Sequence, residues 1–393
     1  MDRQQADILT RQGVDALRNG DAMQARALFG AIADTPPPGS PPPWFLLAQA
    51  CQALGDLAGQ DHALARLLAD EPRHLGGLLL MAGCKAAQGD SRAASSFYTT
   101  ALAVADHAGP AQVPPGLVPL LQQAQHYLAQ AKDEYAAFLT STLAGQGITA
   151  ASVSPRVDMA LDLLLGRRQL YVQEPTSFYF PGLPQRQFYE AQEFDWAEEF
   201  EAAASAMRAE LEDLLDRQPG DFAPYVQTRP DRPAAANHLR DDPSWGAHYL
   251  WEQGMVVADH AALAPVTMRA LQRPPIPVIT DRSPMALYSL LRPGTHIKPH
   301  NGMLNTRLIC HLPLITNPDC AIRVGNETRQ WQQGKLLIFD DSIEHEAWNR
   351  GQATRIILLF EIWRPEISLD ERAALTAIFE AITAYGGLPR DQG

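Results

Sequence analysis

The 393-residue sequence is poor in several features, and each shortage excludes a class of protein. It has four cysteines and no CxxC spacing, which argues against a disulfide-stabilised scaffold and against a cysteine zinc site. No apolar run approaches the roughly 20 residues that a membrane-spanning helix needs, and the first residues lack the apolar core of a signal peptide. We therefore expect a cytoplasmic protein whose cysteines are reduced and buried.

Positive charge is also scarce, with 32 Lys and Arg against 45 Asp and Glu and a net charge of -13. A nucleic-acid-binding protein needs a basic face to displace counterions, so we expect no nucleic acid partner, whereas a basic peptide stays possible. Apolar residues make up 46% of the chain. A globular chain of this length can form two or three domains.

The N-terminal third contains a repeat built on a Gly-Asp pair. The pair occurs at Gly20-Asp21, Gly55-Asp56 and Gly89-Asp90, at intervals of 35 and 34 residues. That interval is typical of tetratricopeptide repeats, in which two antiparallel helices are joined by a turn. The sequence therefore predicts an all-α repeat domain over residues 1-150.

Two further positions recur when the three units are aligned on Gly-Asp. Small residues share one position and bulky residues share the other: Gly13, Ala48 and Ala82, then Phe29, Leu64 and Tyr98. Small residues let paired helices approach, and bulky ones fill the gap between neighbouring units. The prolines at 36–38 and 72 are expected to end the second helices of the first two units.

A further helical pattern from Leu117 to Leu143 is predicted to cap the last repeat. Two roles for the repeat domain stay open. The helices could form a groove that binds a peptide or a partner protein, or they could only solubilise or dimerise the chain.

The pattern loosens between residues 144 and 165, and we place a second domain at residues 165-393. There we predict a helix from Asp195 to Leu215, with Asp195 as its N-cap, covering one outer face of a sheet. The segment Pro224 to Pro277 is expected to form loops over the mouth of the domain. A last helix is expected around Leu369 to Tyr385.

Two histidines stand in polar, turn-forming sequence, His300 within Arg292–Gly302 and His345 within Phe339–Trp348. Neutral imidazole is a common ligand of iron, zinc and copper. Two imidazoles from different strands can hold one face of an ion and leave the other positions open. This pattern predicts a reactive metal site.

Three strands are expected around these histidines. In the first, the period of two places Arg307, Ile309 and His311 on one face. The second is Gly334 to Asp340, and the third, Arg355 to Trp363, folds back antiparallel. Arg355 would then enter the sheet near the second histidine, where a guanidinium suits a bidentate grip on a carboxylate.

Together these motifs resemble a known family. The chain has PHxG at Pro299, NxRLxxHLPL at Asn305, FDDSxEHExW at Phe339 and an arginine ten residues after His345. This order resembles the aspartyl/asparaginyl β-hydroxylases, which use Fe(II) and 2-oxoglutarate, over roughly Tyr171 to Pro365. The resemblance implies an α+β multidomain chain in which helical repeats precede a double-stranded β-helix, a cupin-like jelly roll, with flanking helices.

The resemblance also implies roles for six residues. His300 and His345 would bind Fe(II), Ser289 and Arg355 would hold the distal carboxylate of 2-oxoglutarate, His311 would lie near its other end, and Arg307 would face the substrate or co-substrate. It implies no catalytic side chain beyond these. O2 would be the second co-substrate.

Some positions bear on this assignment. Gly302 stands where most such oxygenases carry a carboxylate, and the family as a whole leaves that place to water. Ile309 and Met255 stand where animal members have basic residues, which would remove positive charge from the pocket. Asp340 or Asp341 could supply a carboxylate to the metal, but we expect both to fix the loop before the second histidine.

Alternatives from the residues alone stay open. Arg307 or Arg355 could be ion-paired with Glu346 or Glu361. Four other histidines are expected to be surface or loop residues: His238, His248, His260 and His296.

The predicted function is hydroxylation of an unactivated C–H bond, at Cβ of an Asp- or Asn-type residue in a peptide, a protein or an amino-acid-derived molecule. An alternative is a non-catalytic tetratricopeptide interaction protein with a hydroxylase-like ligand- or metal-binding barrel. A third is a cupin enzyme that uses zinc or manganese without 2-oxoglutarate, which would leave Arg355 without a role.

Overall fold

The computed structural model describes residues 1–149, 152, 154–218, 220–228 and 237–386. The chain divides into two compact units, Met1–Leu165 and Gly166–Gly393. The expected boundary region lies partly outside the described residues, and its described part contains helix α8 (Pro155–Leu164). Within the described part of the chain, no helix has the length and apolarity to cross a membrane.

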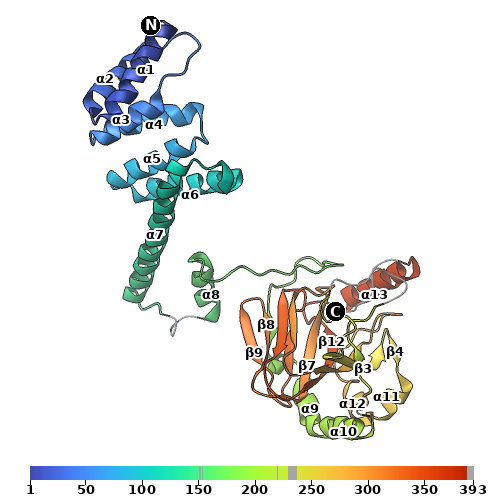
Figure 1. The fold of residues 1–393 in the computed structure, drawn as a ribbon. Helices are drawn as coiled ribbons and strands as arrows, with labels where there is room; N and C mark the ends of the chain where they lie inside the picture. Colours follow the sequence, from blue (N-terminus) through green and yellow to red (C-terminus); the bar gives the residue numbers. More distant parts are fainter. Residues whose placement is uncertain (150–151, 153, 219, 229–236, 387–393) are drawn as a thin grey trace. The chain divides into compact units, whose positions relative to one another are not determined.

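The N-terminal unit consists of three helix pairs followed by one long helix (Figure 1). The helices are α1 (Arg3–Arg18), α2 (Ala22–Asp34), α3 (Trp44–Ala53), α4 (Leu57–Asp70), α5 (Leu75–Ala87), α6 (Ser91–Ala108) and α7 (Val118–Gly145). Helices α2 and α4 end just before the prolines at 36–38 and 72, as predicted.

The repeated Gly-Asp pair has a local physical cause. The three glycines have φ of 83°, 69° and 82°, a left-handed conformation that favours glycine at the end of a helix. Each following aspartate is the N-cap of the next helix and accepts a hydrogen bond from a backbone N–H three residues on. The pair therefore ends one helix and starts the next, which confirms the repeat interpretation.

Packing within the repeats follows the small and bulky positions. Phe29 and Leu64 are completely buried, and Tyr98 is nearly so. A Cβ on Gly13 would lie only 2.6 Å from Cε1 of Phe29, so the first pair depends on the glycine. The start of α7 packs on the last repeat through Ala124, as expected of a cap.

The C-terminal unit contains two antiparallel sheets. The larger has the order β1-β10-β7-β12-β5-β3-β2 with β4 beside β3, and the smaller has the order β6-β11-β8-β9. The strands are β1 (Phe188–Tyr189), β2 (Ala223–Pro224), β3 (Trp245–Glu252), β4 (Met255–Val256), β5 (Ala286–Leu291), β6 (His296–His300), β7 (Arg307–Ile315), β8 (Cys320–Val324), β9 (Glu327–Gln330), β10 (Leu337–Phe339), β11 (His345–Asn349) and β12 (Arg355–Trp363).

The two sheets share one core, and helices cover the outer face of the larger sheet. Leu287 and Ile357 of the larger sheet pack in the same cluster as Ile322 of the smaller one. On β7, Cys310 points the other way, into a cluster with Met207 of the helices before β2. The predicted alternation along this strand and the predicted helical cover are both confirmed.

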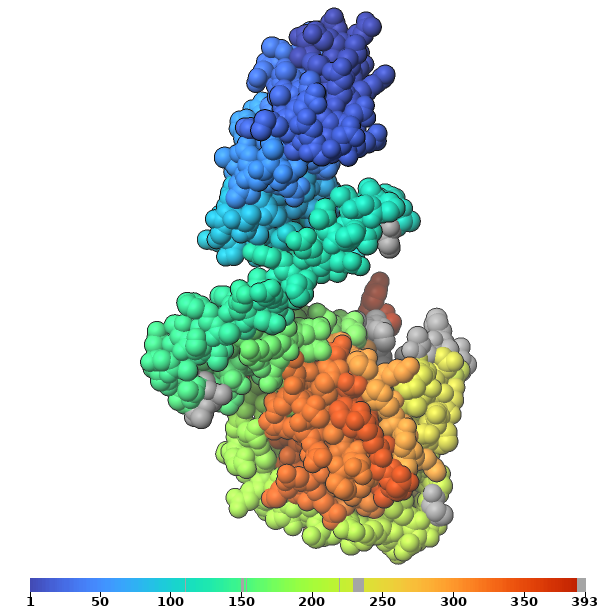
Figure 2. All heavy atoms as spheres, turned by 60° about the vertical axis from the view of Figure 1, so that its left-hand side comes forward, coloured from blue at the N-terminus to red at the C-terminus, as the bar shows by residue number. Residues whose placement is uncertain are grey.

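The smaller sheet forms an outer face of this unit. In Figure 2 the strands β8, β9 and β11 belong to the orange surface that faces the viewer, and the chain around residues 197–217, in yellow-green, lies along its lower edge.

The helix predicted from Asp195 is instead two helices, α9 (Ala197–Ala202) and α10 (Ala204–Arg217). Asp195 is not the cap, because α9 begins after Trp196, which makes no side-chain capping bond. The Trp196 ring lies 6.0 Å from the ring of Phe360 on β12, so the residue before α9 packs against the sheet.

The segment Pro224 to Pro277 is not a set of loops, although residues 229–236 lie outside the described part. It contains the eight-residue strand β3, which pairs with β5, and helices α11 (Ala258–Ala262) and α12 (Pro265–Ala270). The Trp245 ring stacks on Tyr225 at 4.2 Å, and Trp251 is buried in the core. Tertiary packing outweighs the local Pro and Asp content here.

The strand from Arg355 does run antiparallel to its neighbours, but these are β7 and β5 rather than the strand that precedes it. Strand β11 lies in the smaller sheet, so the chain crosses between the sheets on both sides of the second histidine. The last helix, α13 (Leu369–Ala384), confirms the prediction and begins with a capping box between Ser368 and Glu371.

A substitution tests the close approach in the first repeat. We expect Gly13→Ala to lower the free energy of unfolding by about 1–3 kcal/mol, because the added methyl group overlaps the ring of Phe29. Urea denaturation of the full chain followed by circular dichroism measures this.

Gly30→Ala is the matched control in the partner helix, since a Cβ there meets nothing within 4 Å. It should instead stabilise the chain by up to about 1 kcal/mol through helix propensity. Equal effects of the two substitutions would contradict the packing described.

Candidate active site

A cavity of about 430 Å³ opens between the two sheets, and all six residues predicted for the site line it. They are Ser289, His300, Arg307, His311, His345 and Arg355. The structure therefore brings together side chains from β5, β6, β7, β11 and β12. Its volume lies in the range of small-molecule sites.

His300 and His345 face each other from neighbouring strands of the smaller sheet. They are direct register partners, and their ring centroids are 4.2 Å apart. Nδ1 of His300 lies 2.8 Å from the carbonyl of Lys298, and Nδ1 of His345 lies 3.1 Å from the carbonyl of Ile343. Because a carbonyl only accepts, each Nδ1 carries the proton and each Nε2 keeps a lone pair, as in metal-ligating histidines.

Burial keeps both imidazoles neutral. It lowers the pKa of His300 and lowers the pKa of His345 well below the ordinary value. The nearby His300 lowers the pKa of His345 further. Neutral imidazole is the form that coordinates a metal, so the pair suits a cation.

Arg355 is a buried guanidinium whose charge is not matched by a carboxylate. Its Nη1 donates to the Ser289 carbonyl at 3.4 Å, and its Nε has no hydrogen-bond partner among the described residues. Burial lowers its pKa to about 10, and no carboxylate of the described chain contributes to that value. Its Cζ lies 4.8 Å from the ring centroid of Trp331, a cation–π contact.

The alternative ion pairs for Arg355 are wrong. Glu346 binds Arg323 at 2.5 Å, and Glu361 binds Arg307 at 2.7 Å. A buried charge without a partner is costly, and this guanidinium remains available to a carboxylate that enters the cavity.

Trp331 lines the cavity but was not predicted as a pocket residue. Its indole N–H donates to Nδ1 of His311 at 3.2 Å. His311 is neutral, since burial and then the charge of Arg355 hold its pKa well below the ordinary value. Its proton is therefore on Nε2, which makes it a hydrogen-bond donor. Trp331 thus contacts two of the predicted residues, His311 through a hydrogen bond and Arg355 through its ring face.

Arg307 lines the cavity, but its charge is compensated. Nη1 lies 2.7 Å from Glu361 and Nη2 lies 3.3 Å from Asp341, and all three residues are buried. The ion-pair alternative is therefore right for this arginine. The bridge links β7, β12 and the loop before β11.

The two aspartates of that loop differ. Asp340 is completely buried, accepts from the Ser342 backbone N–H at 3.0 Å and pairs with Arg364 at 2.6 Å, so it fixes the loop as expected. Asp341 instead lines the cavity. A Cβ on Gly302 would lie 2.1 Å from its Oδ2, which leaves no room for a carboxylate side chain at residue 302.

The two predicted losses of positive charge do not both affect the cavity. Ile309 lines it, but Met255 is 69% exposed at the start of β4 and is not among the residues that line the cavity. The expectation for Met255 is therefore wrong, because its side chain points to solvent.

Of the other histidines, His296 is exposed and lies 2.7 Å from Glu346, as expected of a surface residue. His238 bonds the His296 carbonyl at an exposed position. The prediction is wrong for His248, which is only 1% exposed on β3, and His260 lies beside it on α11. Nothing in the local pattern indicated that these two would meet.

Solved structures similar to parts of the chain are distant. The N-terminal helices resemble the first tetratricopeptide domain of Spaghetti (RPAP3), solved bound to an HSP90 peptide, at 17% identity over 33% of this chain and 99% of that one, with a TM-score of 0.28. A predicted oxalate decarboxylase from Thermotoga maritima matches 30% of this chain and 81% of its own, at 12% identity and a TM-score of 0.21. No functional conclusion follows from either likeness.

Sequence comparisons are more specific. Residues 201–365 match the family model described as aspartyl/asparaginyl beta-hydroxylase. The human protein of that name is 36% identical over 166 residues, which is 42% of this chain and 20% of that protein. The ornithine lipid ester-linked acyl 2-hydroxylase of Rhizobium tropici is 37% identical over 45% of this chain and 60% of its own length.

This chain thus covers less than two thirds of either relative, and both relatives are named as hydroxylases. All six predicted residues lie within the bounds of this match. The predicted resemblance to the aspartyl/asparaginyl β-hydroxylase family is therefore confirmed over residues 201–365.

Proposed function

We propose that this protein is an Fe(II)- and 2-oxoglutarate-dependent dioxygenase that hydroxylates an unactivated C–H bond. The observation that carries the proposal is Arg355, a buried guanidinium without a carboxylate partner in the described chain, in the same cavity as a pair of neutral histidines. Together these groups match a metal and a dicarboxylic co-substrate.

The proposal includes the fold. From β5 onward the chain crosses repeatedly between the larger and the smaller sheet, and only β8 and β9 are consecutive in one sheet. Such winding is that of a double-stranded β-helix, a form of jelly roll. The alternation supports this assignment, because it brings neighbouring segments to opposite walls of one cavity.

In this proposal, His300 and His345 hold the iron through their Nε2 atoms. Bound iron would supply activation of O2, coupled to oxidative decarboxylation of 2-oxoglutarate to succinate and CO2. Arg355 and Ser289 would bind the distal carboxylate. The Nε2–H of His311 would donate a hydrogen bond near the other end of the co-substrate.

The remaining lining would position the groups and exclude water. Ile309, Ile322 and Ile357 give apolar walls, which strengthen charge interactions inside the cavity. The Arg307 bridge to Glu361 and Asp341 would keep the loop before His345 in place. These residues orient the site without exchanging a proton with the substrate.

For the substrate we propose an Asp- or Asn-type residue in a peptide, protein or amino-acid-derived molecule, which the helical repeats could present. A second candidate is an acyl chain, the group named in the Rhizobium tropici relative. One observation favours it: within the described lining, Arg307 is already ion-paired and Arg355 is assigned to the co-substrate. In both cases the carbon to be hydroxylated, Cβ of the amino acid or C2 of the acyl chain, is bonded directly to a carbonyl carbon.

The histidine pair can be tested by anaerobic titration of the Fe(II)-loaded protein with 2-oxoglutarate. We expect chelation to produce a visible metal-to-ligand charge-transfer band, and we expect His300→Ala to abolish it because one of two ligands is removed. His296→Ala is the matched control, since it removes an exposed histidine from the same strand. A band that survives His300→Ala would overturn the assignment, and so would no band in fully loaded protein.

Arg355 can be tested separately from the metal. We expect Arg355→Ala to keep Fe(II) binding but to weaken 2-oxoglutarate binding at least tenfold, since a hydrogen bond to a charged group contributes about 1.5–3 kcal/mol. Calorimetric titration of the anaerobic protein measures both. Unchanged co-substrate affinity would favour the zinc or manganese cupin alternative.

Turnover separates an enzyme from a ligand-binding barrel. We expect the loaded protein to convert 2-oxoglutarate to succinate slowly alone and at least tenfold faster with its substrate, because coupling to a C–H bond completes the reaction. Aspartate-containing peptides and ester-linked acyl lipids should be compared by succinate formation and by product mass. A mass gain of one oxygen on the lipid alone would select the acyl candidate.

A further inference from the structure

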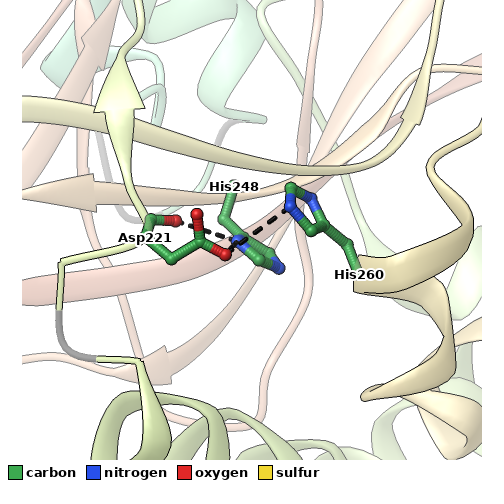
Figure 3. Close-up of side chains that lie close together, drawn as sticks. All are labelled: Asp221, His248 and His260. Carbon is green, nitrogen blue, oxygen red and sulfur yellow. Dashed lines mark hydrogen bonds and ion pairs between the residues drawn. The ribbon is translucent and has the colours of Figure 1, made fainter.

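A second group of metal-type ligands lies outside the cavity. Among the residues that the structure describes, one set of three offers ligand atoms within 4.8 Å of one another: Asp221, His248 and His260. Asp221 follows α10, His248 is on β3 and His260 is on α11, and Figure 3 shows their side chains turned toward one another. The set has two nitrogens and one carboxylate.

This cluster is on the opposite side of β3 from the cavity. Ala247 packs in the cluster between the sheets, whereas His248 points outward, stacked at 6.1 Å on Tyr288 of the outer core. The cluster is therefore distinct from the site that contains His300 and His345.

Both imidazoles are anchored by backbone carbonyls. Nδ1 of His248 lies 2.9 Å from the backbone carbonyl of Asp221 and 3.3 Å from its carboxylate Oδ2, and Nδ1 of His260 lies 2.7 Å from the carbonyl of Tyr249. Since the carbonyls can only accept, both Nδ1 atoms carry protons. The same arrangement orients metal-ligating histidines in general, with Nε2 left as the ligand.

The Nε2 of His248 has no hydrogen-bond partner in the described chain, although the residue is only 1% exposed. Leaving a buried polar atom unsatisfied costs about 1–3 kcal/mol. A buried nitrogen left without a donor in this way requires an explanation.

The carboxylate of Asp221 gives a second reason to expect a cation at this cluster. Oδ2 of Asp221 lies 3.5 Å from Nε2 of His260, beyond a normal hydrogen bond. If Nε2 has only its lone pair, two acceptors face each other and repel. A cation between them removes the repulsion, and two ligands of a tetrahedral ion with bonds of 2.0–2.1 Å lie about 3.3 Å apart.

We propose that Asp221, His248 and His260 bind one divalent transition-metal ion of the zinc class. Two imidazole nitrogens and one carboxylate oxygen form a borderline donor set that suits zinc. A shallow depression lined by Asp221, Asp259 and His260 gives access from solvent, so water can complete the coordination. The ion joins three segments that are distant in sequence and stabilises them. The inference does not depend on the proposed hydroxylase activity.

The test uses the full chain without a polyhistidine tag, stripped with a chelator, in a His300→Ala background that disables the cavity pair. Calorimetric titration with zinc chloride is expected to show one bound equivalent and a rise in Tm. Adding His260→Ala should weaken zinc binding at least tenfold and abolish the rise in Tm. Adding His126→Ala, an exposed histidine on α7, should change neither.

A second variant guards against misfolding. Asp221→Asn keeps the shape of a half-exposed side chain and removes its charge, so it should also weaken zinc binding at least tenfold while circular dichroism stays unchanged. Two results overturn the proposal. One is folded His300→Ala protein that binds no zinc, in which case a proton on Nε2 of His260 accounts for the contact with Asp221. The other is unchanged affinity after His260→Ala.

Discussion

The cavity of the C-terminal unit is organised around one buried positive charge, the guanidinium of Arg355. Arg355 begins β12, a strand that is buried along its whole length between β5 and β7. Burial lowers the pKa of Arg355, which means that the charged form is destabilised. The Ser289 carbonyl and the ring of Trp331 contact the guanidinium and offset part of this cost. A stable fold accepts such a cost only where the surrounding core fixes the side chain, and a ligand carboxylate would offset it.

Two other buried arginines show what full compensation looks like. Arg364 pairs with Asp340 at 2.6 Å with both side chains completely buried, and Arg307 pairs with Glu361 at 2.7 Å. Because Asp340 also accepts from the backbone of Ser342, the first pair fixes the loop that leads into His345. The compensated arginines therefore fix the walls of the cavity, and the uncompensated one is the arginine that we propose binds the co-substrate.

Sequence reasoning was most successful where the cause is local. The Gly-Asp turns, the alternation of Arg307 and His311 along one strand and the C-terminal helix all follow from short-range rules. The six cavity residues were found through ordered motifs. Sequence could not give the placement of His345 in the smaller sheet or of β3 beside β5, because pairing between distant strands is decided by the whole core.

His248 illustrates the same limit and links the two sites. It was expected on the surface because its segment is rich in Pro and Asp, yet it pairs in register with Tyr288 while Ala247 pairs with Ser289. Strand β3 thus presents one face toward the core behind the proposed co-substrate site and the other toward Asp221 and His260. An ion held on the outer face would restrain the strand that neighbours Ser289, so stability at the back of the sheet and geometry in the cavity share one element.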